Sequence, residues 1–126
     1  IAAAKALPRH VLASDIDRRA TIVARENARL NGAGNWVETI CAPGFGAREF
    51  QQRGPFDLVL ANILANPLKR LATPMRQHLA PRATVVLSGL LPQHANGVID
   101  AYRANGLVLQ ERIELEGWTS LLLVRC

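Results

Sequence analysis

Two polar side chains stand at the ends of short segments that have strand character. Asp15 ends the segment 11–15, and Asn62 directly follows the apolar run 58–61. Ligands of open α/β sheets bind at the carboxyl ends of the strands, so both side chains could face a ligand. A carboxylate can accept hydrogen bonds from ribose hydroxyls, and an amide offers both an acceptor and donors. The alternative for both residues is structural, because asparagine and aspartate also close turns and cap helices.

The segment around Asn62 predicts how that side chain is held. Residues 58–60 are apolar at successive positions, which is typical of an inner strand of a parallel sheet with both faces buried. Asn66 suits the N-cap of a following helix, and Pro67 suits its first helical position. Asn62 is therefore expected in the connection between a buried strand and a helix.

The other elements are expected on both sides of this segment. Asp17 is expected to cap a helix that runs to about Asn31, and Pro74 is expected to split the helix after Asn66, with Thr73 capping the second piece. The full set comprises strands at 11–15, 36–41, 57–61, 84–88, 107–115 and 118–124, helices at 1–7 (ended by Pro8), 17–31, 67–79 and 92–105, and a polar connection at 45–54. Periodicity assigns inward faces to Ala20, Val23, Ala24 and Ala28 of one helix, to Ala95, Val98, Ile99 and Tyr102 of another, and to Leu107, Leu109, Ile113 and Leu115 of one strand.

Strands that alternate with helices predict a doubly wound α/β fold. The last two strands, joined at Gly117, predict that a mostly parallel sheet ends in a C-terminal antiparallel hairpin. The length of 126 residues suits one domain over residues 1–126.

Composition and charge narrow the class of protein. Hydrophobic residues make up 49% of the chain, and no apolar run reaches the ~20 residues of a membrane helix, so no membrane partner is expected. Cys41, Cys126 and the 3 histidines lack the spacing of metal ligands, so no metal site is expected. The net charge of +5 allows an acidic partner such as ribosomal RNA but does not require one.

Three segments resemble signatures of a known family, in the order in which the family has them. They are ANILANPL at 61–68, SGLL at 88–91 and EGWTSL at 116–121. They resemble the PrmA family of bacterial methyltransferases, which modify a large-subunit ribosomal protein, and the resemblance extends over residues 1–126. It implies the Rossmann-like fold of class I S-adenosylmethionine-dependent methyltransferases and a cytoplasmic enzyme. The targets would be lysine and N-terminal amino groups of the ribosomal protein.

The resemblance also implies that parts of the enzyme precede this chain. Ile1 lies within an alanine-rich helical pattern and is not an initiator methionine. The family's first strand, its glycine-rich loop and its substrate-recognition domain would come earlier, so this catalytic-domain fragment alone could be inactive. Because that first strand would lie at the centre of the sheet, the strands that end at Asp15 and Ala61 are not expected to pair with each other.

By resemblance, the site residues divide between cofactor binding and catalysis. The cofactor, S-adenosyl-L-methionine, would be bound by Asp15 at its ribose, by Ile16, Ala42, Pro43 and Gly44 at its adenine, and by Asn62. The catalytic residues would be Asn62, Ile63 and Trp118. The side-chain oxygen of Asn62 and the backbone carbonyl of Ile63 would accept hydrogen bonds from the target amine. Trp118 would form a wall of the amine pocket. No general base is evident. The alternatives are a plain turn at 42–44 and a core or edge aromatic at Trp118.

Two other functions stay open at this point. A nucleic-acid base methyltransferase would need an aromatic side chain after Asn62 to stack on a flipped base, and residues 63–65 (ILA) offer none. No direct contact with nucleic acid is therefore expected. A truncated, non-catalytic methyltransferase-like module is the second alternative, and cofactor binding would distinguish it from an enzyme.

Overall fold

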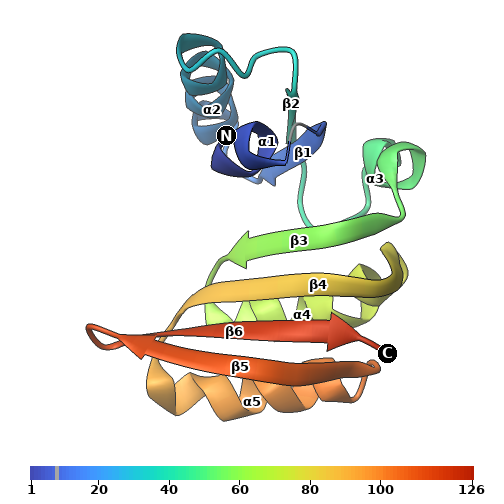
Figure 1. Ribbon diagram of the computed structural model, residues 1–126, viewed down its shortest axis with the longest axis vertical. Coiled ribbons are helices and arrows are strands. Elements are labelled where there is room, and N and C mark those ends of the chain that lie inside the picture. Colours follow the sequence, from blue (N-terminus) through green and yellow to red (C-terminus); the bar gives the residue numbers. More distant parts are fainter. Residues whose placement is uncertain (8) are drawn as a thin grey trace. The chain divides into compact units, whose positions relative to one another are not determined.

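The computed structural model describes residues 1–7 and 9–126. They form two compact units, Ile1–Phe50 and Gln51–Cys126, and each is described by itself. The predicted end of the first helix at Pro8 lies outside the described residues. The elements, labelled in Figure 1, are α1 (Ala2–Ala6), β1 (Val11–Asp15), α2 (Arg18–Leu30), β2 (Val37–Cys41), α3 (Arg48–Arg53), β3 (Phe56–Asn62), α4 (Ala65–Arg76), β4 (Leu79–Leu90), α5 (Pro92–Arg103), β5 (Leu107–Leu115) and β6 (Trp118–Arg125).

The first unit is built on the parallel pair β1 and β2, against which α2 packs. The helix begins as predicted, because the Asp17 side chain accepts a hydrogen bond from the Arg19 N–H at 2.8 Å. Gly32 follows its end with a φ of 71°, a left-handed conformation that glycine adopts without strain. Thr21 and Ala28 are buried, whereas Val23 is 57% exposed, so the prediction of an inward Val23 is wrong.

The second unit contains a four-stranded mixed sheet with the order β3-β4-β6-β5 (Figure 1). β3 is parallel to β4, and β6 is antiparallel to both β4 and β5. The predicted C-terminal hairpin is confirmed. Glu116 and Gly117 have φ values of 53° and 82°, as the tight turn of a hairpin requires.

β1 and β3 belong to different sheets in the part of the chain that the structure describes. This confirms the prediction that the strands ending near Asp15 and Ala61 do not pair. In the described residues β3 is an edge strand of the second unit's sheet, and Leu60 is 60% exposed. Because the strand expected beside β3 would by resemblance precede this chain, the inner position of β3 stays a prediction. The strand with the greatest burial is β4.

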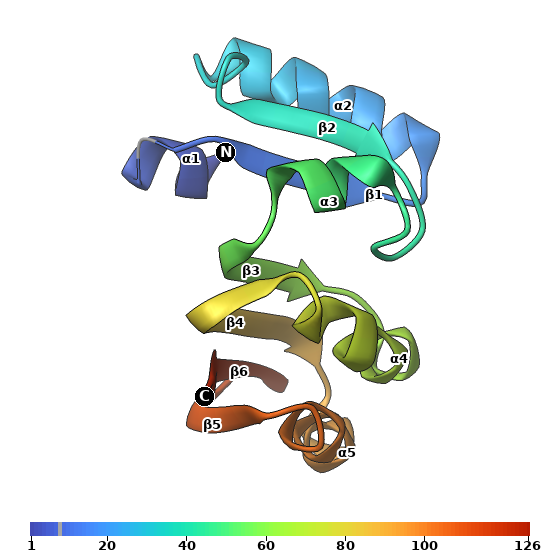
Figure 2. The ribbon, with the colours of Figure 1, turned by 90° about the vertical axis from the view of Figure 1, so that its right-hand side faces the viewer.

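α4 and α5 pack against each other and lie on the same face of the four-stranded sheet (Figure 2). All four α5 residues predicted to face inward are buried: Ala95, Val98, Ile99 and Tyr102. The Tyr102 hydroxyl donates a hydrogen bond to the Leu68 carbonyl of α4 at 2.8 Å. Burial raises the pKa of Tyr102 above that of free tyrosine. This contact joins α4 and α5.

Three predicted boundaries are corrected around α4. The helix has Leu64 at its N-cap, so Asn66 and Pro67 are its second and third residues instead of its cap and first residue. It also continues through Pro74 to Arg76. Pro74 lies in the last turn of α4, so the N–H donor that it lacks costs the helix one hydrogen bond near its end. Burial of Ala72 before it and Met75 after it stabilises the helix on both sides of Pro74.

Further differences concern α3 and the strands. The segment predicted as a polar connection contains the short helix α3, with Phe50 buried. β4 is longer than predicted and includes Leu79, which was assigned to the preceding helix. A bulge between Leu109 and Glu111 changes the register of β5, so Ile113 and Leu115 do not share the buried face of Leu107.

Candidate functional site

The carboxyl ends of β1 and β2 lie side by side in the first unit. Asp15 is opposite Cys41 in the parallel register, and the Ala42 N–H donates to the Asp15 carbonyl at 3.0 Å. The Cys41 thiol contacts the Ile16 carbonyl, with Sγ 3.5 Å from the oxygen. The structure therefore brings Asp15 and Ile16 together with the segment that begins at Ala42, as expected for neighbouring parallel strands.

The Asp15 side chain is exposed and partly engaged by the turn. Its Oδ1 accepts a hydrogen bond from the Asp17 N–H at 2.9 Å, which is the local role that the sequence left open. Its second oxygen is not engaged by any of the residues that the structure describes. Ile16 beside it has 75% of its surface exposed. One carboxylate oxygen and one apolar side chain are thus available to a ligand at this strand end.

Asn62 is the last residue of β3 and pairs with Ser88 of β4. Its side chain is exposed and makes no hydrogen bond to the turn in the described parts of the chain. The amide oxygen lies against Gly89, so close that a Cβ added there would be 2.1 Å from Oδ1. The structure therefore places the hydrogen-bond acceptor of Asn62 over the end of β4.

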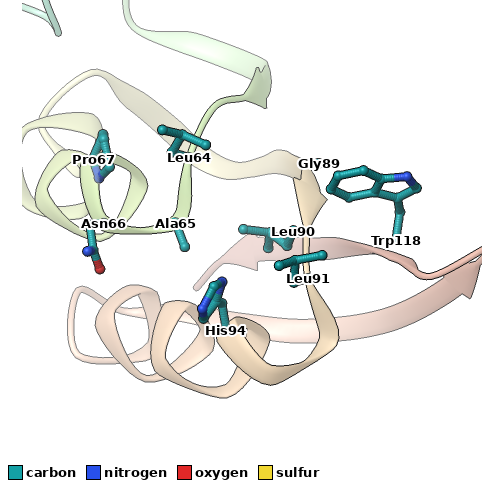
Figure 3. Close-up of a pocket in the computed structure, with 9 residues that line it drawn as sticks. All are labelled: Leu64, Ala65, Asn66, Pro67, Gly89, Leu90, Leu91, His94 and Trp118. Carbon is teal, nitrogen blue, oxygen red and sulfur yellow. The ribbon is translucent and has the colours of Figure 1, made fainter.

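A pocket of about 400 Å³ lies beside this pair in the second unit. Figure 3 shows the Trp118 ring next to Gly89, with Leu64 and Pro67 on the other side of the pocket. The polar side chains of the lining are those of Asn66 and His94, and the rest of it is apolar. The lining residues are Leu64, Ala65, Asn66, Pro67, Gly89, Leu90, Leu91, His94 and Trp118.

The predicted catalytic residues relate to this pocket in different ways. Trp118, which is 55% exposed, lines it directly. Asn62 contacts the lining through Gly89, and Ile63 is not among the lining residues. The pocket can take an extended apolar chain with a polar end, since its walls are apolar and an amide oxygen lies at Gly89.

Sequence reasoning missed two residues of this site. Gly89 was noted only as part of a family signature, and the histidines were considered only as metal ligands. His94 is exposed and lines the pocket. Both lie at or just after the carboxyl end of β4, so the strand-end rule that selected Asn62 could have selected them. The close approach of Gly89 to Asn62 has no local sequence signal, because it depends on the register of β3 and β4.

No group of three or more histidine, cysteine or acidic side chains in the described residues could hold a metal ion. No helix of the same residues is long and apolar enough to cross a membrane.

Comparison with protein families gives a match over nearly the whole chain. The model of the family described as Ribosomal protein L11 methyltransferase (PrmA) matches residues 1–125. The ribosomal protein L11 methyltransferase of Rhodopseudomonas palustris (strain BisB5) is 65% identical over 99% of this chain and 42% of its own length. That of Bradyrhizobium diazoefficiens is 63% identical over 98% and 42%, respectively. The chain thus spans less than half the length of these relatives.

Solved structures show the same fold. A ribosomal protein L11 methylase from Lactobacillus delbrueckii subsp. bulgaricus is similar over 92% of this chain and 58% of its own, with 28% identity and a TM-score of 0.83. A methyltransferase from Pyrococcus furiosus is similar over 98% and 66%, with 20% identity and a TM-score of 0.79. An RNA methyltransferase from Salinibacter ruber, solved with S-adenosyl-L-homocysteine, is similar over 91% and 65%, with 19% identity and a TM-score of 0.70. The fold is therefore the α/β fold of class I methyltransferases.

Proposed function

This chain belongs to the family of ribosomal protein L11 methyltransferases, and on that basis we propose that the full-length protein methylates lysine and N-terminal amino groups of ribosomal protein L11. The methyl donor is S-adenosyl-L-methionine, and residues 1–126 form part of one methyltransferase domain. The reaction takes place in the cytoplasm, where ribosomal proteins are synthesised.

The observation that carries this proposal is the arrangement of Asn62, Gly89 and Trp118. The Asn62 amide oxygen lies over Gly89, and Gly89 and Trp118 line the same apolar pocket. A lysine side chain has a long apolar stem and a nitrogen at its end. Such a chain fits a pocket with apolar walls and an acceptor at one side.

The first unit supplies the residues that would hold the cofactor. The second Asp15 oxygen can accept hydrogen bonds from ribose hydroxyls, and the exposed Ile16 side chain can lie against an adenine ring. Backbone groups of Ala42, Pro43 and Gly44 follow the adjacent strand end and complete this set. When bound, S-adenosyl-L-methionine supplies an electrophilic methyl group.

The second unit supplies the residues that prepare the amine. A lysine ammonium has a pKa near ~10.4 in water and must lose a proton before it can act as a nucleophile. The apolar walls of the pocket disfavour the charged form, and the Trp118 ring face can accommodate the cation before it is deprotonated. Asn62 Oδ1 and the Ile63 carbonyl then accept hydrogen bonds from the neutral amine and orient its lone pair.

The direct test is a methyl-transfer assay with the full-length protein. Purified ribosomal protein L11 is incubated with the protein and S-adenosyl-L-methionine that carries a labelled methyl group, and peptides are analysed by mass spectrometry. We expect label on lysine side chains and on the N-terminal amine. Ribosomal RNA serves as the alternative substrate, and label on RNA alone would contradict the proposal.

A non-catalytic role is tested by the same preparation. Isothermal titration calorimetry with S-adenosyl-L-homocysteine measures cofactor binding. A protein that binds neither this compound nor S-adenosyl-L-methionine would be a methyltransferase-like module without activity. We expect binding, because Asp15 and Ile16 are both exposed at the carboxyl end of β1.

A further inference from the structure

We infer that Gly89 is a positioning residue, whose missing side chain allows the Asn62 amide to take its orientation toward the pocket. A Cβ at position 89 would lie 2.1 Å from Asn62 Oδ1 and 3.1 Å from Asn62 Cγ. The first distance is far inside van der Waals contact, so a side chain at position 89 and the observed Asn62 orientation exclude each other. This inference rests on the proposed function of Asn62.

The geometry also predicts which of the two residues would move. Gly89 lies in the register shift of β4 between Leu87 and Leu90, but both of its chain neighbours are paired: Ser88 pairs with Asn62 of β3. Leu90 pairs with Thr119 of β6, so the backbone is held directly before and after Gly89. The Asn62 amide is the exposed end of a short side chain that rotates about two single bonds. A Cβ at position 89 would therefore displace the amide and leave the strands in place.

Displacement of the Asn62 amide would move the oxygen that is proposed to accept a hydrogen bond from the target amine. Gly89 is both the residue under the Asn62 oxygen and a wall of the pocket. The Asn62 oxygen therefore lies beside a residue that lines the pocket. Misplacement of a reacting group by about 1 Å can lower a rate by ~10²-fold, even when the fold is unchanged.

The substitution Gly89→Ala adds backbone strain, which needs a matched control. Gly89 has a φ of 75°, a conformation that alanine adopts with strain. Gly32, after α2 in the first unit, has a φ of 71°, and a Cβ there would meet nothing within 4 Å. Gly32→Ala therefore adds similar backbone strain without a collision, far along the chain from Asn62.

The test compares kcat and KM for methylation of ribosomal protein L11 by the full-length protein. For Gly89→Ala we expect kcat to fall by ~10-fold or more, with a smaller change in KM for S-adenosyl-L-methionine. Gly32→Ala should keep the wild-type kcat. In the background Asn62→Ala, the change Gly89→Ala should lower kcat no further, because the side chain that it displaces is gone. Wild-type kcat in Gly89→Ala, or an equal loss in both backgrounds, would overturn the inference.

A second measurement is independent of activity. The side-chain amide resonances of Asn62, assigned in ¹⁵N-labelled protein by their loss in Asn62→Ala, should shift in Gly89→Ala and stay unchanged in Gly32→Ala. Unchanged resonances in Gly89→Ala would contradict the inference even if the protein has no methyltransferase activity. If Gly89→Ala does not fold, recovery of folding in Asn62→Ala/Gly89→Ala supports the inference, and failure of both variants contradicts it.

Discussion

At the residue scale, Asp15 and Asp17 show how two carboxylates so close in sequence can have different roles. Asp17 caps α2, because its side chain accepts a hydrogen bond from the Arg19 N–H. Asp15 gives one oxygen to the Asp17 N–H and leaves the other to solvent. The local and the ligand-binding interpretations of Asp15 are therefore compatible, because a carboxylate has two oxygens.

The change Asp15→Ala should weaken cofactor binding in the full-length protein. Loss of a hydrogen bond to a charged group typically costs ~1.5–3 kcal/mol, so the Kd for S-adenosyl-L-homocysteine should rise by roughly 10- to 100-fold. Isothermal titration calorimetry measures this change. Asp17→Ala is the control, because loss of a helix cap should lower stability by ~0.5–2 kcal/mol and leave the Kd unchanged. If only Asp17→Ala raised the Kd, the ribose would be bound by Asp17 instead.

Residues whose roles are set by nearby sequence were predicted well. The Asp17 cap and the turn at Gly117 are examples, because capping and tight turns depend on a few consecutive residues. The contact between Asn62 and Gly89 joins residues on different strands and depends on the pairing of Asn62 with Ser88. No pattern within either segment encodes that register, so the contact became visible only in the structure.

At the element scale, α5 and α4 differ in how well the sequence specified them. α5 begins with Pro92 at its first turn and buries the residues that its periodicity predicts. α4 contains two prolines, which suggested a late start and a break at Pro74. Burial of Leu68, Ala72 and Met75 on one side of the helix outweighs these local signals. Tertiary packing, which a local pattern does not report, decided the helix boundaries.

The buried contact between these helices is tested by Tyr102→Phe. The change removes the hydrogen bond to the Leu68 carbonyl at a fully buried site, and a typical net cost is ~0.5–1.5 kcal/mol. Chemical denaturation of the full-length protein should show this loss at neutral pH. Methylation activity should be close to wild type, because Tyr102 does not line the pocket.

The same variant has a signature at alkaline pH. Burial raises the pKa of Tyr102, so above pH ~10 the unfolded chain loses the phenol proton while the folded chain retains it. The folded state then binds more protons than the unfolded state, and the free energy of unfolding falls as the pH rises. The loss should be smaller in Tyr102→Phe. Equal pH dependence of the two proteins above pH ~10 would show that Tyr102 is not buried as described.

At the scale of the whole molecule, the predicted fold class and terminal hairpin are confirmed, and the inner position of β3 stays a prediction. Residues 58–60 of β3 are apolar at successive positions, so burial of both faces of the strand is favourable. This pattern does not specify which segment covers them or pairs with the strand's edge. In the described residues β3 pairs with β4 alone, and Leu60 is largely exposed. Asn62 lies at the end of this strand, whose other edge is unpaired in the described residues.

The residues at the ends of β1 and β3 indicate different roles for the two units, cofactor binding for the first and binding of the target amine for the second. The first unit offers an exposed acid and an exposed isoleucine, which suit a nucleoside. The second offers an amide oxygen and an apolar pocket with Trp118, which suit an amine on a long side chain. This division predicts that substitutions at Asp15 act on cofactor affinity and that substitutions at Asn62 act on methyl transfer.

The most direct test of this account is single-turnover methylation of ribosomal protein L11 by Asn62→Ala in the full-length protein. Asn27→Ala, the same change at an exposed position of α2, is the matched control. We expect Asn62→Ala to lower the methyl-transfer rate by ~10²-fold or more, with little change in cofactor affinity and a Tm within a few degrees of wild type. Asn27→Ala should react at the wild-type rate. A near-wild-type rate for Asn62→Ala, or a collapse of its stability together with its activity, would contradict the proposed role of Asn62.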